Sequence, residues 1–332
     1  MIASGNAAPA GAAGEGMLAE LTRTRWQTVR ARAGAALASP LAVTLSRWLS
    51  PVVGAAMIGA LIYQASDIGW STIARVFPRS PWFYLIFAAA YIGPIFTEMS
   101  IYRKLWHLNW TAAPMFFRKR VMNEALFGYS GEAYAVFWAR ARGVPGAAAL
   151  AAVRDINILS AAIGILSTVM LLALTLFLAE GARLANAAVA SSGPAVAVAL
   201  IVMLAALLVI ALKPRLFSLP RSALLYASAV HAGRVVFSIA TTVGMWAIAL
   251  PGYSWALWLT LAAWRAFFQR LPLVPNKDLL FVNLAILALT ERGGKDVAAL
   301  LASTAALTLA AHVVSMVATS LVRSPTRAVE LR

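Results

Sequence analysis

The chain has 332 residues, of which 61% are hydrophobic and only 12% are charged, and its mean hydropathy is +0.79. A globule of this size in water needs more polar surface, so the composition excludes a soluble protein and indicates an all-α polytopic membrane protein. The formal net charge of +16 does not indicate nucleic-acid binding, because the basic residues flank the apolar runs and no recognition motif accompanies them.

The segment before the first apolar run differs in composition from the rest. Its first 16 residues are rich in Ala, Gly and Ser, which predicts a disordered tail rather than a signal peptide. Residues 17–48 mix arginines with Leu and Val, which fits either a basic helix lying on an anionic leaflet or a solvated helix that carries topology charges. We therefore expect three regions, at residues 1–48, 49–322 and 323–332, with the middle one in the membrane.

Apolar runs of membrane length predict about six full spans. They lie at about residues 51–65, 82–102, 156–179, 195–212, 235–250 and 297–322. Basic clusters follow the second, fourth and last of these runs, and the positive-inside rule assigns such clusters to the cytoplasm. We therefore expect a multi-pass protein of the bacterial inner membrane with both termini in the cytoplasm.

The apolar stretch 121–139 contains a polar break at residues 123–132. Charged groups and glycines are costly in the bilayer core unless protein or a water-filled cavity covers them. Arg140, Arg142 and Arg154 follow the break, and a full crossing would place them outside the cell. Charge bias therefore favours a re-entrant hairpin that returns to the cytoplasmic side.

A second polar break, at residues 269–278, interrupts the stretch 255–289. If both termini are cytoplasmic, this segment enters and leaves on the outer side, opposite to the first. The breaks resemble each other in kind, because each begins with a polar pair, Asn123-Glu124 or Gln269-Arg270, and a helix breaker follows. Two opposed hairpins predict an inverted repeat whose polar elements meet near the middle of the membrane.

These breaks and their flanks supply the candidate substrate-binding or translocation residues, which are Glu124, Gly131, Glu132, Arg140, Arg154, Asp155, Arg265, Arg270, Pro272, Pro275, Asn276 and Lys277. Structural roles remain open for several of them. Glu132 fits an ion pair with Arg154 or Arg270, Asp155 fits a cap at the start of a long helix, and Arg140 fits a membrane anchor. Residues 272–278 also fit a solvated turn.

No sign of enzymatic chemistry appears in the sequence. It contains no nucleophile elbow and no Walker loop, and almost no chain remains outside the membrane to form a catalytic domain. There is no cysteine, and the three histidines, His107, His231 and His312, match no metal spacing. We therefore expect neither catalysis nor a metal nor a cofactor.

Several short motifs resemble the lysylphosphatidylglycerol synthase transmembrane, or flippase-like, family. These are the Gly131-Glu132 pair with Arg140 after it, the helix at Val153-Arg154-Asp155, the segment 103–106, and the turn 271–275 in place of the family's second, Pro-Gly-rich turn. The chain departs from the family in the letters of that turn and lacks the soluble aminoacyl-transfer domain. The resemblance implies lipid or lipid-linked head-group translocation, with Glu132, Arg140 and Arg154 as the transferable positions.

The sequence thus predicts a flippase or transporter that binds an anionic phospholipid or lipid-linked substrate between the two hairpins. Two alternatives stay open. One is a non-transporting scaffold or subunit of an envelope-lipid enzyme, with an envelope-biosynthesis protein as its partner and the polar clusters as packing contacts. The other is a small-solute or proton-coupled transporter.

Overall fold

The computed structural model describes residues 59, 62–63, 66–67, 69–125, 129–178, 197–208, 210, 216–271, 274, 276–290 and 294–322. The chain divides into two units, residues 1–52 and 53–332, and all of the described residues belong to the second unit. The predicted tail and basic helix at 1–48, most of the predicted span at 51–65 and the tail at 323–332 therefore lie outside the described residues.

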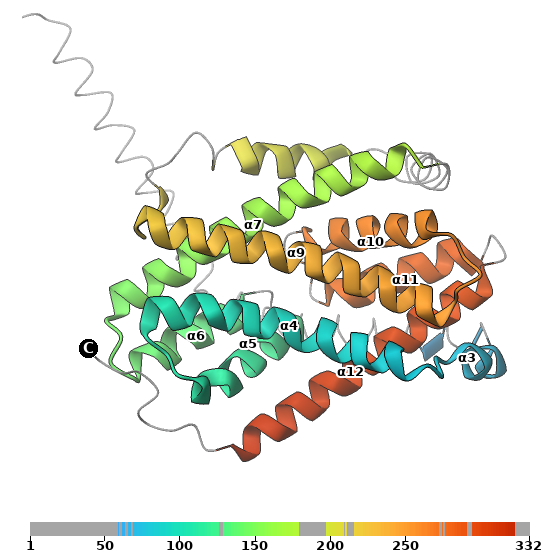
Figure 1. Ribbon diagram of the computed structural model, residues 1–332, viewed down its shortest axis with the longest axis horizontal. Helices are drawn as coiled ribbons and strands as arrows, with labels where there is room; N and C mark the ends of the chain where they lie inside the picture. The colour runs from blue at the N-terminus through green and yellow to red at the C-terminus, as the bar shows by residue number, and fades with distance from the viewer. Residues whose placement is uncertain are drawn as a thin grey trace, which may run out of the picture. The chain divides into compact units, whose positions relative to one another are not determined.

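The described residues form helices and contain no strand (Figure 1). The elements are α3 (Trp70–Val76), α4 (Pro81–Trp106), the short 3₁₀ helix η1 (Trp110–Ala112), α5 (Ala113–Ala125), α6 (Ser130–Arg140), α7 (Gly146–Leu176), an apolar helix at Ala197–Leu208, α9 (Arg221–Ala249), α10 (Trp255–Gln269), α11 (Lys277–Thr290) and α12 (Lys295–Leu321).

Helix ends occur where the sequence supplies helix starters or breakers. Pro81 occupies the first turn of α4, where its missing N–H costs no hydrogen bond, and α4 ends at His107 in the left-handed conformation (φ 50°). Pro145 precedes the first residue of α7, and the Ser254 hydroxyl caps α10 by accepting a hydrogen bond from the backbone N–H of Leu257 at 3.2 Å.

Within the described residues, four helices are long and apolar enough to cross a membrane: α4, α7, α9 and α12. Their 26 to 31 residues exceed the roughly 20 that a bilayer core requires. Large apolar side chains such as Leu85, Met170, Val236 and Val314 are exposed on them, as expected for surfaces that contact lipid. These features confirm the prediction of an all-helical membrane protein. The predicted span at 195–212 corresponds to the shorter helix at 197–208.

The order of helices repeats. A long helix, two short helices and a second long helix make up α4–α7, and the same order recurs in α9–α12. The short helices of each set, α5 with α6 and α10 with α11, contact each other as a helical hairpin. We call α4–α7 the first half and α9–α12 the second half. The predicted polar breaks lie at the tips of the two hairpins.

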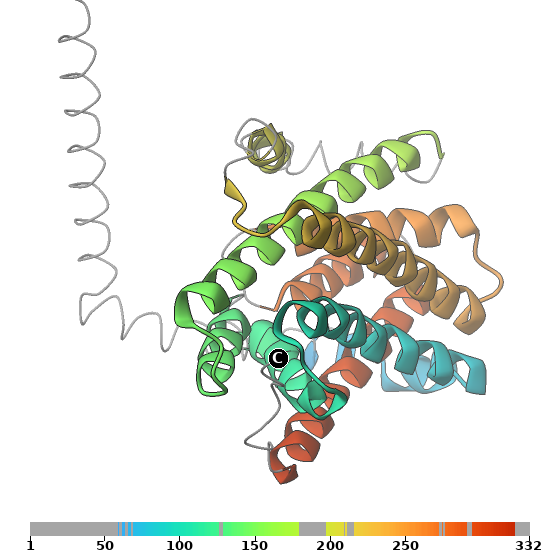
Figure 2. The same ribbon diagram turned by 60° about the vertical axis from the view of Figure 1, so that its left-hand side comes forward.

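The two halves are arranged with opposite directions. Helices α4 and α9 pack side by side and run in opposite directions, and α7 and α12 also run oppositely, as the two views in Figures 1 and 2 show. The hairpins therefore start from opposite ends of the α4–α9 pair. Each hairpin packs against the last long helix of the other half, because α5 contacts α12 and α10 contacts α7.

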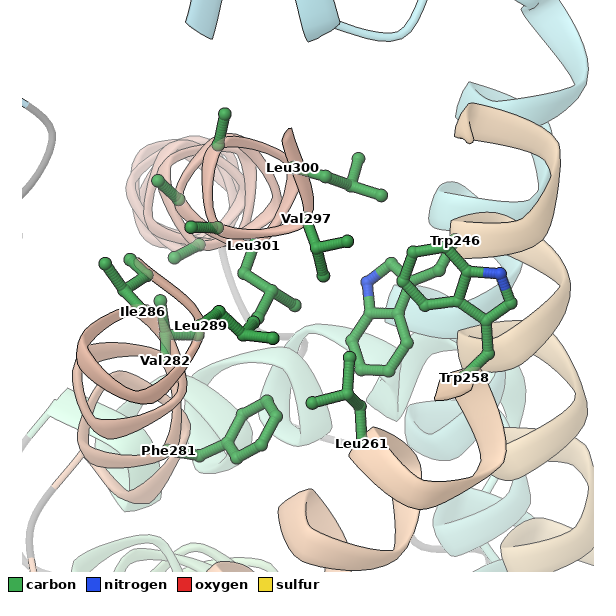
Figure 3. Close-up of a cluster of buried hydrophobic side chains, with 14 of the residues drawn as sticks. Trp246, Trp258, Leu261, Phe281, Val282, Ile286, Leu289, Val297, Leu300 and Leu301 are labelled. Atoms are coloured by element: carbon green, nitrogen blue, oxygen red, sulfur yellow. The ribbon is translucent and has the colours of Figure 1, made fainter. Parts of the chain in front are cut away.

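Each half contributes most of one buried cluster. Buried side chains mainly from α4 to α7 form one cluster around Tyr102 and Phe116, which Ala227 of α9 joins, and those mainly from α9 to α12 form another around Trp258, which Val76 of α3 and Phe83 of α4 join. Figure 3 shows the second cluster, in which Trp246 and Trp258 face Leu300 and neighbouring residues of α11 and α12. Two halves with the same helix order and opposite directions are the arrangement expected of an inverted repeat.

Candidate functional site

The first hairpin is held together by a buried lysine. Lys119 on α5 is only 2% exposed, and its Nζ donates to Glu132 Oε1 on α6 at 2.8 Å. Asn123, one turn further along α5, donates from Nδ2 to the same carboxylate oxygen at 3.1 Å. The Lys119 ammonium also donates to Glu98 Oε1 on α4 at 2.5 Å, so it bridges two acidic side chains. We call Lys119, Asn123 and Glu132 the first clamp.

The second hairpin has the same arrangement with different residues. Arg265 on α10 forms a bidentate pair with Asp278 on α11, at 2.8 and 2.9 Å, and Gln269 donates to Asp278 Oδ1 at 2.7 Å. Arg265 Nη1 also donates to the Thr242 hydroxyl on α9 at 3.3 Å. We call Arg265, Gln269 and Asp278 the second clamp.

The two clamps match in register as well as in chemistry. Cation and carboxylate are 13 residues apart in each, and amide and carboxylate are 9 apart. All three members of the second clamp follow those of the first by the same 146 residues. In both halves the cation also bonds to a side-chain oxygen of the preceding long helix, Glu98 or Thr242. A shared pattern of this kind supports an internal repeat.

A cavity of about 460 Å³ lies between the halves, and both polar breaks contribute to its wall. Asn123 and Glu124 come from the first break, and Gln269, Arg270, Val274 and residues 276–278 come from the second. The long helices contribute further polar groups, which are Tyr91, Glu98, Ser167, Thr168, Arg234, Ser238, Thr242, Thr304, Thr308 and His312. The two tips predicted to meet thus both line one cavity.

Positive charge is in excess on this wall. Among the described lining residues there are five cations, Arg120, Arg234, Arg265, Arg270 and Lys277, and three carboxylates, those of Glu98, Glu124 and Asp278. Arg120 pairs with Glu124, and Arg265 pairs with Asp278. The cavity can therefore accept an anionic group without first removing a native ion pair.

The remaining three cations have no carboxylate partner within the described chain. Arg234 donates to the Ser160 hydroxyl at 2.8 Å, and Lys277 donates to the backbone oxygen of Gln269 at 3.1 Å. The guanidinium of Arg270 lies so close to Gly164 of α7 that a Cβ there would collide with it. We call Arg234, Arg270 and Lys277 the free cations of the cavity.

The opposite wall carries a chain of hydrogen bonds around Glu124. Its Oε2 lies 2.5 Å from His312 Nε2 on α12, and Arg120 Nε lies 3.1 Å from its Oε1. The other ring nitrogen of His312 lies 2.8 Å from the Tyr91 hydroxyl, which in turn lies 3.1 Å from the Ser315 hydroxyl. This chain connects the first hairpin to two long helices, α4 and α12.

Several predicted site residues lie away from the cavity lining. Arg140 is exposed at the end of α6 and packs against Gly146. Gly131 allows α5 and α6 to approach closely, because a Cβ would collide with the Lys119 carbonyl oxygen, and its N–H donates to Asn123 Oδ1 at 2.7 Å. Glu132 belongs to the first clamp and is connected to the lining through Asn123, and through Lys119 to Glu98.

The prediction that Arg154 and Asp155 open a long helix is wrong, because α7 already begins at Gly146. The alanine-rich segment after Pro145 has high helix propensity, so the helix starts two turns earlier. Asp155 is fully buried and accepts hydrogen bonds from the backbone N–H groups of Ser218 and Leu219, at 2.5 and 2.9 Å. The pair therefore ties α7 to the segment before α9, with Arg154 Nη2 at 2.7 Å from Asp155 Oδ1.

The tip of the second hairpin is described in part. Pro272 and Pro275 lie outside the described residues. Asn276 lines the cavity with a φ of 48°, a left-handed conformation that asparagine tolerates better than most residues. Arg265, Arg270 and Lys277 line the cavity as well, so the second break contributes most of the predicted residues found there.

Sequence reasoning missed the roles of three groups. Lys119 was interpreted as a topology charge, although it is buried, and the matching spacing of Arg265 and Asp278 is the signal that could have revealed it. His312 was considered only as a metal ligand, although an isolated ionisable residue inside an apolar run is by itself a sign of function. Arg234 interrupts an apolar run, where a long side chain can extend to the membrane surface, and the structure places it in the cavity lining instead.

The described residues contain no group of three or more His, Cys, Asp or Glu side chains that could hold a metal ion. Surplus arginine and lysine instead suit an anion, since a guanidinium donates two parallel hydrogen bonds to phosphate or carboxylate oxygens. No family model matches the chain, and neither a curated protein nor a solved structure matches it.

Proposed function

We propose that this protein binds the anionic head group of a phospholipid or lipid-linked substrate in the cavity and moves it between the leaflets of the bacterial inner membrane. The observation that carries the proposal is that both polar breaks meet at one cavity whose wall holds the free cations Arg234, Arg270 and Lys277. An anion there would complete interactions that the protein itself leaves open.

The repeat supports alternating access as the mechanism. Many transporters consist of two halves of opposite orientation, bind substrate near the midplane between broken helices, and expose the site by rocking one half against the other. Here α5 packs on α12 and α10 packs on α7, so each hairpin is attached to the long helix of the other half. Relative motion of the halves would then open the cavity at one end while closing the other.

The proposed topology has about six full spans and two re-entrant hairpins, with both termini in the cytoplasm. The four long helices supply four of these spans, and we assign the others to residues 51–65 and 195–212. The hairpins α5–α6 and α10–α11 would enter from opposite leaflets, in agreement with the opposite directions of α4 and α9. This arrangement fits the resemblance to the flippase-like family.

The clamps and the cavity suggest different roles for Glu132, Arg140 and Arg154, the three positions that the family resemblance singles out. Glu132 would act by shaping the first hairpin, whereas Arg140 and Arg154 lie outside the lining and would contact lipid head groups at the surface or hold loops. We therefore propose that Arg270, Arg234 and Lys277 carry head-group binding in this chain.

Reconstitution into liposomes tests the proposal. The expected result is exchange of a fluorescent phosphatidylglycerol between leaflets faster than in empty vesicles, with a slower rate in Arg270→Gln. Removing a charged hydrogen-bond partner costs about 1.5–3 kcal/mol of binding, or roughly tenfold to a hundredfold in affinity. Arg140→Gln is the matched control, because Arg140 is an arginine outside the lining, and it should exchange lipid at the wild-type rate. Equal rates of lipid exchange in empty and protein-containing vesicles would contradict the proposal and favour the scaffold alternative.

A further inference from the structure

We propose that Glu124 and His312 form a proton-binding site and that this site couples substrate movement to a proton gradient. The inference rests on the proposed function of the cavity, because it names what drives the movement. Both residues line the cavity, and neither forms part of a clamp.

The site joins three elements by short contacts. Glu124 comes from the tip of the first hairpin, His312 from the middle of α12, and Tyr91 from α4, with distances of 2.5 Å from carboxylate to imidazole and 2.8 Å from imidazole to phenol. Histidine is the side chain whose charge changes most readily in the physiological pH range. Because the His312 imidazole borders the cavity, a change in its charge would act electrostatically on a substrate bound there.

The hydrogen-bond chain can satisfy both protonation states of His312. In the neutral state, Nε2–H donates to Glu124, and Nδ1 accepts from the Tyr91 hydroxyl, which can accept from Ser315. After a proton from cavity water adds to Nδ1, that nitrogen donates to the Tyr91 oxygen, and the Tyr91 hydroxyl turns to donate to Ser315. Both ring nitrogens of His312 and the Tyr91 oxygen therefore keep hydrogen-bond partners in both states, so the proton can be taken up and released without leaving the imidazole unpaired.

The charged and titratable groups around the site come from each neighbouring element. Arg120 of α5 pairs with Glu124 and lies over the Tyr91 ring, 4.5 Å from its centroid. Arg265 of α10 also acts on Glu124 electrostatically. With Glu124 already balanced by Arg120, a proton on His312 adds a positive charge to the cavity wall. A bound anionic head group would attract that positive charge, and the attraction is strong where the dielectric constant is low. Binding of the substrate would therefore favour binding of the proton, and the reverse.

The corresponding position in the second half cannot change its charge in this way. Arg270 follows Glu124 by the same 146 residues that separate the clamps, and it lies against Gly164 of α7, the counterpart of α12. One hairpin thus contacts the opposite half through a permanent cation, and the other contacts it through a titratable pair. Of these two described contacts, only the one between α5 and α12 therefore responds to a proton.

A transport assay under a pH gradient tests the coupling. One proton carried with each lipid makes a gradient of one pH unit worth about 1.4 kcal/mol, so labelled phosphatidylglycerol should accumulate up to about tenfold in the leaflet that faces the higher pH. In His312→Gln this ratio should fall to about one. His231→Gln is the matched control, because His231 is buried on α9 outside the cavity lining, and it should keep the wild-type ratio.

Nuclear magnetic resonance of the full chain in nanodiscs tests proton binding without transport. The chain has three histidines, so His312→Gln identifies the His312 signal among those of ¹⁵N-labelled histidine. As the pH is varied, that signal should change reversibly between its neutral and charged forms. The charged fraction at a given pH should be larger in nanodiscs of phosphatidylglycerol than in nanodiscs of phosphatidylcholine. A signal that stays in one form overturns the proposal. Lipid exchange that does not depend on the pH gradient also overturns the proton-coupling proposal, but it leaves the proposed function intact. A complete lack of lipid exchange contradicts the proposed function itself.

Discussion

Replacing Lys119 with Met should destabilise the protein by about 3–5 kcal/mol, the usual cost of removing one partner from a buried ion pair. The estimate is appropriate because the Lys119 side chain is only 3% exposed, while those of Glu98 and Glu132 are 18% and 13% exposed. Methionine fills a similar volume, so the loss comes from leaving two carboxylates without their shared cation rather than from a void.

Equilibrium unfolding in a mild detergent measures this change. Lys295→Met is the control, because Lys295 is exposed at the start of α12, and its effect should stay within about 0.5 kcal/mol. Adding Glu98→Gln and Glu132→Gln to Lys119→Met should restore most of the lost stability, since no buried charge then lacks a partner. A loss below about 1 kcal/mol, or no recovery in the triple variant, would refute the assigned role of the clamp.

Two further predictions test the second half. Arg265→Met should lower the free energy of unfolding by about 1.5–3 kcal/mol in the same assay. The loss should be smaller than for Lys119→Met, because the side chains of Arg265 and Asp278 are more exposed, at 29% and 26%. Adding Asp278→Asn should recover stability, and a failure to recover would count against the second clamp. Gly164→Ala should displace the Arg270 guanidinium and slow lipid exchange. Gly146→Ala, whose added methyl group would contact the exposed Arg140, should leave the exchange rate unchanged. Equal effects of the two substitutions on exchange would contradict a role for Arg270.

Much of the helical architecture follows from the sequence. The predicted spans 82–102, 235–250 and 297–322 lie within or nearly coincide with α4, α9 and α12, because a long apolar run leaves the backbone no other way to satisfy its hydrogen bonds in lipid. The hairpins were located through their polar breaks, since glycine, proline and charge interrupt a membrane helix at a visible cost. The start of α7 was missed, because helix propensity rather than hydropathy determines it.

The partners of the polar residues could not be predicted in the same way. Lys119 stands beside Arg118 and Arg120, and a basic triplet at the end of an apolar run has the composition of a topology signal. The sequence predicts an inverted repeat, but the correspondence between individual residues was equally hard to detect, because no clamp residue is identical in the two halves: lysine matches arginine, asparagine matches glutamine, and glutamate matches aspartate. Only the distances between side chains show that Lys119 is buried and paired.

The division of polar residues into paired and free groups separates packing from function. If every polar group served only to hold helices together, each buried cation would have its own anion, as Lys119 and Arg265 do in the clamps. Arg234, Arg270 and Lys277 lack such partners in the described chain, although they are only partly exposed on a cavity wall, where a charge without a partner is costly. The proposed binding site would account for that cost, because an anion supplied from outside would provide the missing partner.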